Sequence, residues 1–224
     1  MEHQEELFKF RCRFEKTGPL RFISHLDLTR AFHRAFLRAG LSLKFSEGFS
    51  PHPKFSLALP LSVGTESLTE LADFSLTPQD GITKDVLADR LQAQMPAGIR
   101  ILAIEEQGEK FSEIFYASYT VFLPKADPAL ASAIQTIDRN SLKITKKNKK
   151  GKTVEKELAQ GIQSLLATQK DGGIQIETVL CVSGENYLKP ESLLEALQAR
   201  IPSLNPLGKR ICRTQIFREN MTRF

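Results

Sequence analysis

Hydrophobic and polar positions alternate near the start of the chain. Over residues 7–14, Phe8, Phe10, Cys12 and Phe14 alternate with polar, mostly basic side chains. A period of two is typical of a strand with one buried face. Comparable apolar patterns predict further strands at residues 41–45, 55–61, 72–76, 99–104, 119–123, 174–182 and 210–217.

The clearest helix signal follows the first strand. Ser24 can cap the helix, and Asp27 three residues later completes a capping box. Gly40 can end the helix in a left-handed turn. The sequence therefore predicts a helix over residues 25–39. Three further helices are expected: residues 84–94, a helix starting at Pro128 and a helix starting at Pro190.

Each half of the chain repeats the order β-α-β-β-α-β. This order is that of a ferredoxin-like unit. We therefore expect an α+β fold of two ferredoxin-like units in tandem, with antiparallel sheets, over residues 1–110 and 111–224. The segment 155–168 fits either a helix or a pair of strands.

The apolar runs and the cysteines of the sequence indicate the compartment in which the protein works. None of its 224 residues falls in an apolar run long enough to span a bilayer, and the N-terminus has no apolar signal core. Three widely separated cysteines favour reduced thiols over a disulfide framework. We expect a cytoplasmic protein without a membrane partner.

The charge is unevenly distributed. The net charge is +5, but residues 8–60 hold ten basic residues against three acidic ones, and residues 139–156 hold eight against one. Residues 61–138 reverse the balance, with five basic and twelve acidic residues. Such blocks can present basic surfaces to phosphates, so we expect a polyanion partner, namely RNA.

An arginine stripe runs along the first predicted helix. Arg30, Arg34 and Arg38 are spaced four residues apart, which places them on one side of the helix. Guanidinium groups bind phosphate oxygens bidentately, and Arg21 and Lys44 would extend the patch. The alternative interpretation is a solvated helix face.

The loop at residues 47–54, EGFSPHPK, is stiffened by two prolines. Phe49, His52 and Lys54 would contact an unpaired base or a sugar-phosphate bend. The alternative is a proline-locked turn with a local histidine contact. A weaker hypothesis makes His25 or His52 the general base of a metal-independent endoribonuclease.

A lysine-rich turn follows at residues 143–156, within a predicted strand–turn–strand. Its lysines can contact a nucleic-acid backbone, or can protect a sheet edge from aggregation. They are Lys146, Lys147, Lys149, Lys150 and Lys152.

Signatures of cofactor and metal sites are missing from the sequence. The histidines lack ligand spacing, no CxxC pair occurs, and the common nucleotide-binding and hydrolase motifs are absent. We expect no metal and no cofactor in this chain.

One stretch resembles a known family. RFISHLDLTRAFHRAFLRA at residues 21–39, followed by GLSLKFSEGFSPHPKFSLALPLSVGTES, resembles the radical SAM-linked domain of unknown function. The matching positions are Arg21, Ser24, His25, Asp27, Arg30, Ser46, Gly48, Phe49, Pro51, His52, Pro53 and Lys54.

The resemblance implies a radical SAM partner that carries an iron–sulfur cluster and S-adenosylmethionine, and a link to RNA or ribosome metabolism. Cys12, Cys181 and Cys212 cannot form the CxxxCxxC cluster of such an enzyme. The tandem layout is also similar to that of CRISPR endoribonucleases, although PLGKRICR lacks their glycine-rich loop.

The resulting functional hypothesis is a non-catalytic accessory module that binds RNA (tRNA, rRNA or ribosome-associated RNA) for a radical SAM partner. The alternatives are the endoribonuclease described above and a protein-docking adaptor that binds no RNA. The oligomeric state is left open.

Overall fold

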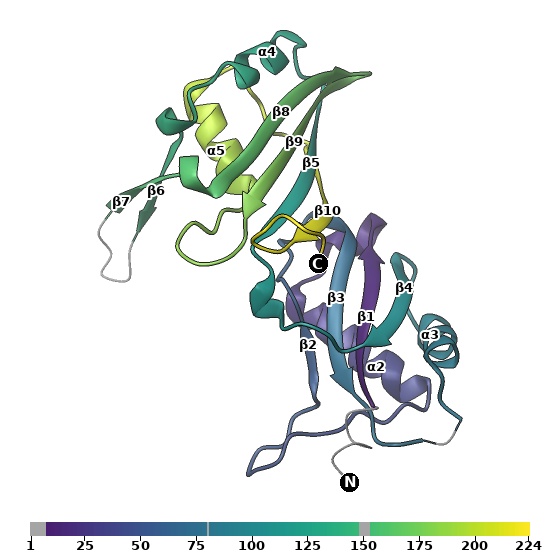
Figure 1. Ribbon diagram of the computed structural model, residues 1–224. Coiled ribbons are helices and arrows are strands. Elements are labelled where there is room, and N and C mark those ends of the chain that lie inside the picture. Colours follow the sequence, from purple (N-terminus) through teal and green to yellow (C-terminus); the bar gives the residue numbers. More distant parts are fainter. Residues whose placement is uncertain (1–7, 80, 148–152) are drawn as a thin grey trace. The chain divides into compact units, whose positions relative to one another are not determined.

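The computed structural model describes residues 8–79, 81–147 and 153–224 (Figure 1). Its fold is mixed α+β, and the described residues form four α-helices and antiparallel sheets. Residue contacts divide the chain into two compact units, one ending at Phe111 and the other beginning at Ser112. No described helix combines the length and the apolar character that a membrane crossing requires.

Unit 1 has the element order β-α-β-β-α-β. Strand β1 pairs with β3 on one side and β4 on the other, and β2 pairs with the far side of β3, all antiparallel. The elements are β1 (Lys9–Lys16), the 3-10 helix η1 (Gly18–Phe22), α2 (His25–Arg38), β2 (Phe55–Leu57), β3 (Thr65–Ser75), α3 (Lys84–Gln92) and β4 (Ile99–Glu106).

The core of unit 1 lies between its sheet and its helices. The predicted alternation in β1 buries Phe10, Cys12 and Phe14, which face α2. The rings of Phe14 and Phe32 have centroids 4.9 Å apart, in an edge-on arrangement. This aromatic packing fixes which side of α2 faces the sheet and which side faces solvent.

Helix α2 confirms the prediction for residues 25–39. The Ser24 side chain accepts a hydrogen bond from the backbone N–H of Asp27. At the other end Gly40 has φ +65°, a backbone conformation that glycine adopts without strain.

Two strand predictions in unit 1 need correction. Residues 41–45 form only isolated bridges, from Leu43 to Leu76 and from Phe45 to Pro53. The strand expected over 55–61 stops at Leu57. Pro60 lies in that segment and has no N–H to donate to a ladder, which shortens the pairing.

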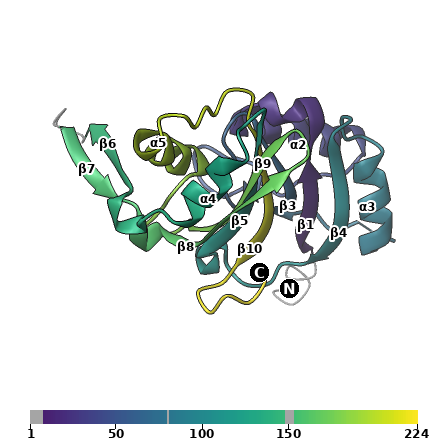
Figure 2. The same ribbon diagram turned by 90° about the horizontal axis from the view of Figure 1, so that it is seen from above.

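Unit 2 also contains a four-stranded antiparallel sheet, in the order β10-β5-β9-β8. A separate two-stranded hairpin, β6–β7, follows α4 in the chain and contacts α5 (Figure 2). The elements are η2 (Phe111–Glu113, across the boundary), β5 (Tyr116–Pro124), α4 (Ala129–Gln135), η3 (Arg139–Ser141), β6 (Lys143–Lys147), β7 (Thr153–Glu157), η4 (Ala159–Gly161), β8 (Ile162–Lys170), β9 (Gly173–Cys181), α5 (Pro190–Arg200) and β10 (Arg210–Phe217).

The segment 155–168 forms strands, not a helix. It contains the end of β7, the short η4 turn and most of β8, which pairs with β9. Gly161 occupies a tight turn, where an added Cβ would lie 2.7 Å from the carbonyl oxygen of Asn186. Pairing with a neighbouring strand therefore outweighs the helical spacing of the apolar residues in this segment.

Candidate nucleic-acid interface

The outward side of α2 carries the three predicted arginines, and all three are exposed. Arg30 forms an ion pair with Asp27 at 3.2 Å. Arg38 donates hydrogen bonds to the side chain and the backbone carbonyl of Gln94. Arg34, between them, makes no hydrogen bond or ion pair with any described residue. The stripe therefore offers one unpaired guanidinium flanked by two partly engaged ones.

The buried side of α2 explains the position of this stripe. Leu28, Phe32, Ala35 and Phe36 are buried against the sheet. Because 3.6 residues complete one turn, the arginines at intervals of four fall on the solvent side. The stripe is thus a direct consequence of the helix period and of the apolar face.

Residues 43–54 form a hairpin arm that projects beyond β2 (Figure 1). Its two sides are joined by the bridge from Phe45 to Pro53 and by a hydrogen bond from the backbone N–H of Ser46 to the carbonyl of His52. Ser46 Oγ also lies 2.9 Å from His52 Nδ1. At the tip, the side chain of Phe49 is fully exposed. The arm thus presents an aromatic ring to solvent.

The remaining predicted cations of unit 1 differ in their surroundings. Arg21 lies 3.6 Å from Glu66 and stacks over the ring of Phe22. Lys44 is half-buried, on the side of the arm opposite Lys54. Lys54 is exposed and forms no ion pair with the described residues.

His52 and Lys54 line a hollow of about 320 Å³ together with Asp73 and Gln107. Asp73 accepts a hydrogen bond from the Gln107 side chain at 2.9 Å. Two predicted site residues therefore converge on a concave surface, next to a buried carboxylate.

His25 and His52 have separate neighbours. His25 begins α2 and lines a hollow of about 10 Å³ beside the buried Lys16 and Glu70. That hollow has room for about one water molecule and none for a substrate. His52 instead lies in the hairpin arm, beside Ser46. Among the described residues no hydrogen bond or ring contact joins the two histidines.

Sequence reasoning missed a buried ion pair. Arg11 was expected on the polar face of β1, yet it is 4% exposed and donates two hydrogen bonds to Asp73, at 2.7 and 2.8 Å. It also donates to the carbonyl of Glu109 and lies over the ring of Phe111. Glu109 and Phe111 lie in the segment after β4, and this segment therefore covers Arg11 on this face of the sheet. Only the opposite charges of Arg11 and Asp73 hinted at this pair in the sequence.

The predicted lysine hairpin of unit 2 exists as β6 and β7. Lys143 pairs with Glu157 at 3.1 Å and lies 3.8 Å from Glu155. Lys146 and Lys147 belong to β6. Their side chains, and the whole of Lys149, Lys150 and Lys152, lie outside the described residues.

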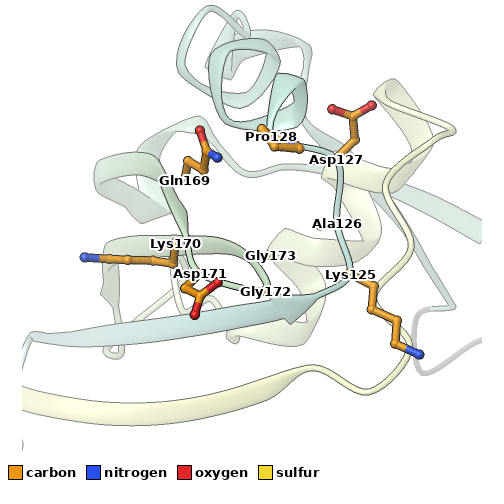
Figure 3. Close-up of a pocket in the computed structure, with 9 residues that line it drawn as sticks. All are labelled: Lys125, Ala126, Asp127, Pro128, Gln169, Lys170, Asp171, Gly172 and Gly173. Carbon is orange, nitrogen blue, oxygen red and sulfur yellow. The ribbon is translucent and has the colours of Figure 1, made fainter.

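Unit 2 also has a wide, open hollow of about 790 Å³, which the sequence did not predict (Figure 3). It lies between the loop after β5 and the turn from β8 to β9. Figure 3 shows the side chains of Lys125, Lys170 and Asp127 pointing in different directions. Since its charged groups have mixed signs and do not converge, this hollow provides no defined binding site.

The three cysteines are free thiols. Burial raises the pKa of the Cys12 thiol far above its usual range, which disfavours the reactive thiolate. Across the described residues no three His, Cys, Asp or Glu side chains are grouped closely enough to hold a metal ion.

Most of the chain matches the model of one protein family. Residues 9–190 match the model of a family described as "Uncharacterized protein conserved in bacteria (DUF2344)". The chain belongs to this family. The DUF2344 match includes all of unit 1 from the start of β1 and extends through unit 2 to the first residue of α5. The arginine stripe, the hairpin arm and the lysine hairpin therefore all fall within the DUF2344 region.

Comparison of the sequence with curated proteins gives no significant match. The DUF2344 description names no partner and no activity. The radical SAM partner and the similarity to CRISPR endoribonucleases therefore stay predictions.

Proposed function

We propose that this protein binds single-stranded RNA through unit 1, as a non-catalytic accessory module. The observation that carries the proposal is the unpaired Arg34, flanked by Arg30 and Arg38 on the exposed side of α2. Exposed guanidinium groups in a row suit a chain of phosphates, because each can bind two phosphate oxygens.

The hairpin arm supports RNA over other polyanions. Proteins that bind single strands combine basic tracks with aromatic side chains on which bases stack. Phe49 is a fully exposed aromatic ring on an arm braced by Pro53 and by the contacts between Ser46 and His52. Exposure of such a ring costs hydrophobic free energy, which stacking on a base would recover.

The wider role in this proposal rests on the resemblance described for residues 21–67. We infer that the bound RNA is a tRNA, an rRNA or a ribosome-associated RNA in the cytoplasm, and that a radical SAM protein is the partner. The element order and the strand order β4-β1-β3-β2 of unit 1, with the matching order β10-β5-β9-β8 of unit 2, support a tandem ferredoxin-like architecture.

The test is a fluorescence anisotropy titration with a fluorescein-labelled oligouridylate over a range of salt concentrations. Wild-type protein is expected to bind, with an affinity that falls steeply as salt rises. Arg34→Gln should weaken binding about fivefold, and should reduce the salt slope by about 0.7, since one phosphate contact is lost. Phe49→Ala should weaken binding about tenfold through the lost stacking.

Two control variants remove one exposed cation and one exposed apolar side chain from unit 2. Lys170→Gln removes an exposed cation of unit 2, and Leu207→Ala removes a side chain of unit 2 that is 80% exposed. Both should leave the affinity unchanged within about twofold. Absence of binding at physiological salt would refute the proposal in favour of a protein-docking adaptor. Cleavage of the RNA that His25→Ala or His52→Ala abolishes would favour the endoribonuclease.

A further inference from the structure

An apolar hollow lies between the second half of α2 and the hairpin arm. We name it the α2 hollow; its volume is about 390 Å³, within the range of ligand pockets. It lies entirely in unit 1. Its lining residues are His33, Phe36, Leu37, Gly40, Leu41, Ser42, Leu43, Phe45 and Pro53.

The rim of the α2 hollow keeps large apolar side chains in water. Leu37 is 80% exposed and Phe45 is 51% exposed. Both residues belong to segments that other contacts hold in place. Leu37 lies on α2, whose opposite face is buried, and Phe45 lies on the hairpin arm, where it forms the bridge to Pro53. Exposed apolar side chains that are grouped around a concave surface are a feature of ligand-binding grooves and of interaction sites.

The wall of the α2 hollow contains an unsatisfied polar group. Nε2 of His33 is buried and has no hydrogen-bond partner. The ring packs edge-on against Phe55, with centroids 5.2 Å apart. Burial lowers the pKa of His33, which favours the neutral imidazole. Because Nε2 has almost no accessible surface, a ligand in the hollow would pack against the neutral His33 ring and would not hydrogen-bond to this nitrogen.

The arginine stripe runs beside the α2 hollow. Arg30 and His33 are three residues apart on α2, as are Arg34 and Leu37, and side chains at this spacing are neighbours. No Asp or Glu is among the lining residues. We therefore expect a ligand whose apolar, flat group lies inside the hollow and whose negatively charged group lies outside it, next to Arg34.

We propose that the α2 hollow binds one unpaired nucleobase of the RNA, with its phosphate held by the arginine stripe. This inference rests on the proposed function and adds a second base-binding site to Phe49. The volume of about 390 Å³ is large enough for one base, and Phe45 and Leu37 are among the apolar side chains that line it. A partner helix would instead need a groove with apolar anchors along several turns.

The test compares two labelled chains of equal length: an oligouridylate, and the same ribose-phosphate chain without bases. Both are titrated against the Phe49→Ala protein, so that stacking at the arm tip does not contribute. This protein is expected to bind the base-containing chain about tenfold more tightly, the effect of one stacked base. Ser42→Trp, introduced in addition, should fill the hollow and abolish this preference without changing any charge.

Ser42→Ala is the matched control and should keep the tenfold preference. Ser42 is exposed, and thermal unfolding checks that the tryptophan is tolerated. If that variant unfolds, Leu37→Lys replaces it: the side chain is largely exposed, and an added cation cannot weaken phosphate binding.

The outcomes separate the two proposals. Equal affinity for the two chains, or a preference that survives Ser42→Trp, would overturn the base-binding inference and leave RNA binding intact. Failure of both chains to bind wild-type protein would overturn the proposed function itself.

Discussion

The surroundings of an arginine in unit 1 decide what its guanidinium does. Arg11 is buried, bonded to Asp73 and covered by Phe111, so its charge is used within the fold. Arg34 is exposed and without a partner among the described residues, so its charge is available to a ligand. Both residues look alike in the sequence, as basic positions on the polar side of an amphipathic element.

Loss of the Asp73 charge should destabilise the protein strongly. Asp73→Asn removes the carboxylate that accepts two hydrogen bonds from the buried Arg11 guanidinium. Breaking a buried ion pair in this way typically costs about 3–5 kcal/mol. Urea unfolding followed by circular dichroism measures the change. Glu105→Gln is the control, because the Arg13–Glu105 pair is 30% and 45% exposed. That change should cost less than about 1 kcal/mol. Similar stability of the two variants would contradict this account of the ion pair.

At the scale of the element, α2 combines local and long-range signals that agree. Ser24 caps it, Gly40 ends it and the helix period exposes its arginines. The hairpin arm is different, because its residues form no regular strand and are held by a few bridges. The candidate interface therefore joins a helix with local capping signals to an arm that depends on tertiary contacts.

Removal of the cap should weaken α2 in a pH-dependent way. The pKa of Asp27 is lowered, first by the hydrogen bond from the Ser24 hydroxyl and then by Arg30. A lowered pKa stabilises the fold above the unfolded pKa of the carboxyl, and this stability is lost as the pH falls through the folded pKa. Ser24→Ala should raise the Asp27 pKa towards its ordinary value and cost about 1 kcal/mol near neutral pH.

NMR titration of the Asp27 carboxyl and thermal unfolding at neutral and acidic pH measure these effects. The stability difference from wild type should shrink in acid. Thr29→Ala on the same helix is the control, since its hydroxyl donates to the carbonyl of His25 and does not contact Asp27 among the described residues. An Asp27 pKa that Ser24→Ala leaves unchanged would refute the role of the cap.

At the scale of the whole molecule, the chain forms two compact units. One hydrophobic cluster has fifteen buried members, all from residues 10–104 of unit 1. The arginine stripe, the hairpin arm and the α2 hollow lie in the same unit, and the lysine hairpin lies in unit 2. RNA binding should therefore need unit 1 and gain from unit 2.

Unit 1 alone, as a fragment ending at Phe111, should fold and bind RNA. Circular dichroism should show cooperative thermal unfolding, because the fragment keeps its sheet, both helices and their core. Anisotropy should show binding with a smaller salt slope than that of the full chain, since the phosphate contacts of the lysine hairpin are lost. A folded fragment that does not bind oligouridylate would move the interface to unit 2.

The sequence by itself determined the elements and part of the site. Alternation in β1, β9 and β10, capping at Ser24 and the arginine spacing on α2 are local patterns, and local patterns depend on backbone periodicity and on nearby side chains. The order of strands and helices in unit 1 could be predicted for the same reason, whereas the described residues of unit 2 form six strands and not the four of the predicted order.

Only the tertiary structure decided which charges are buried, where the strands pair and where the chain is concave. The Arg11–Asp73 pair joins residues 62 positions apart, and β8 became a strand because β9 lies beside it. The α2 hollow forms where an arm 43–54 returns to the helix that precedes it. Such contacts depend on residues far apart in the chain, and hydrophobic periodicity carries no information about them.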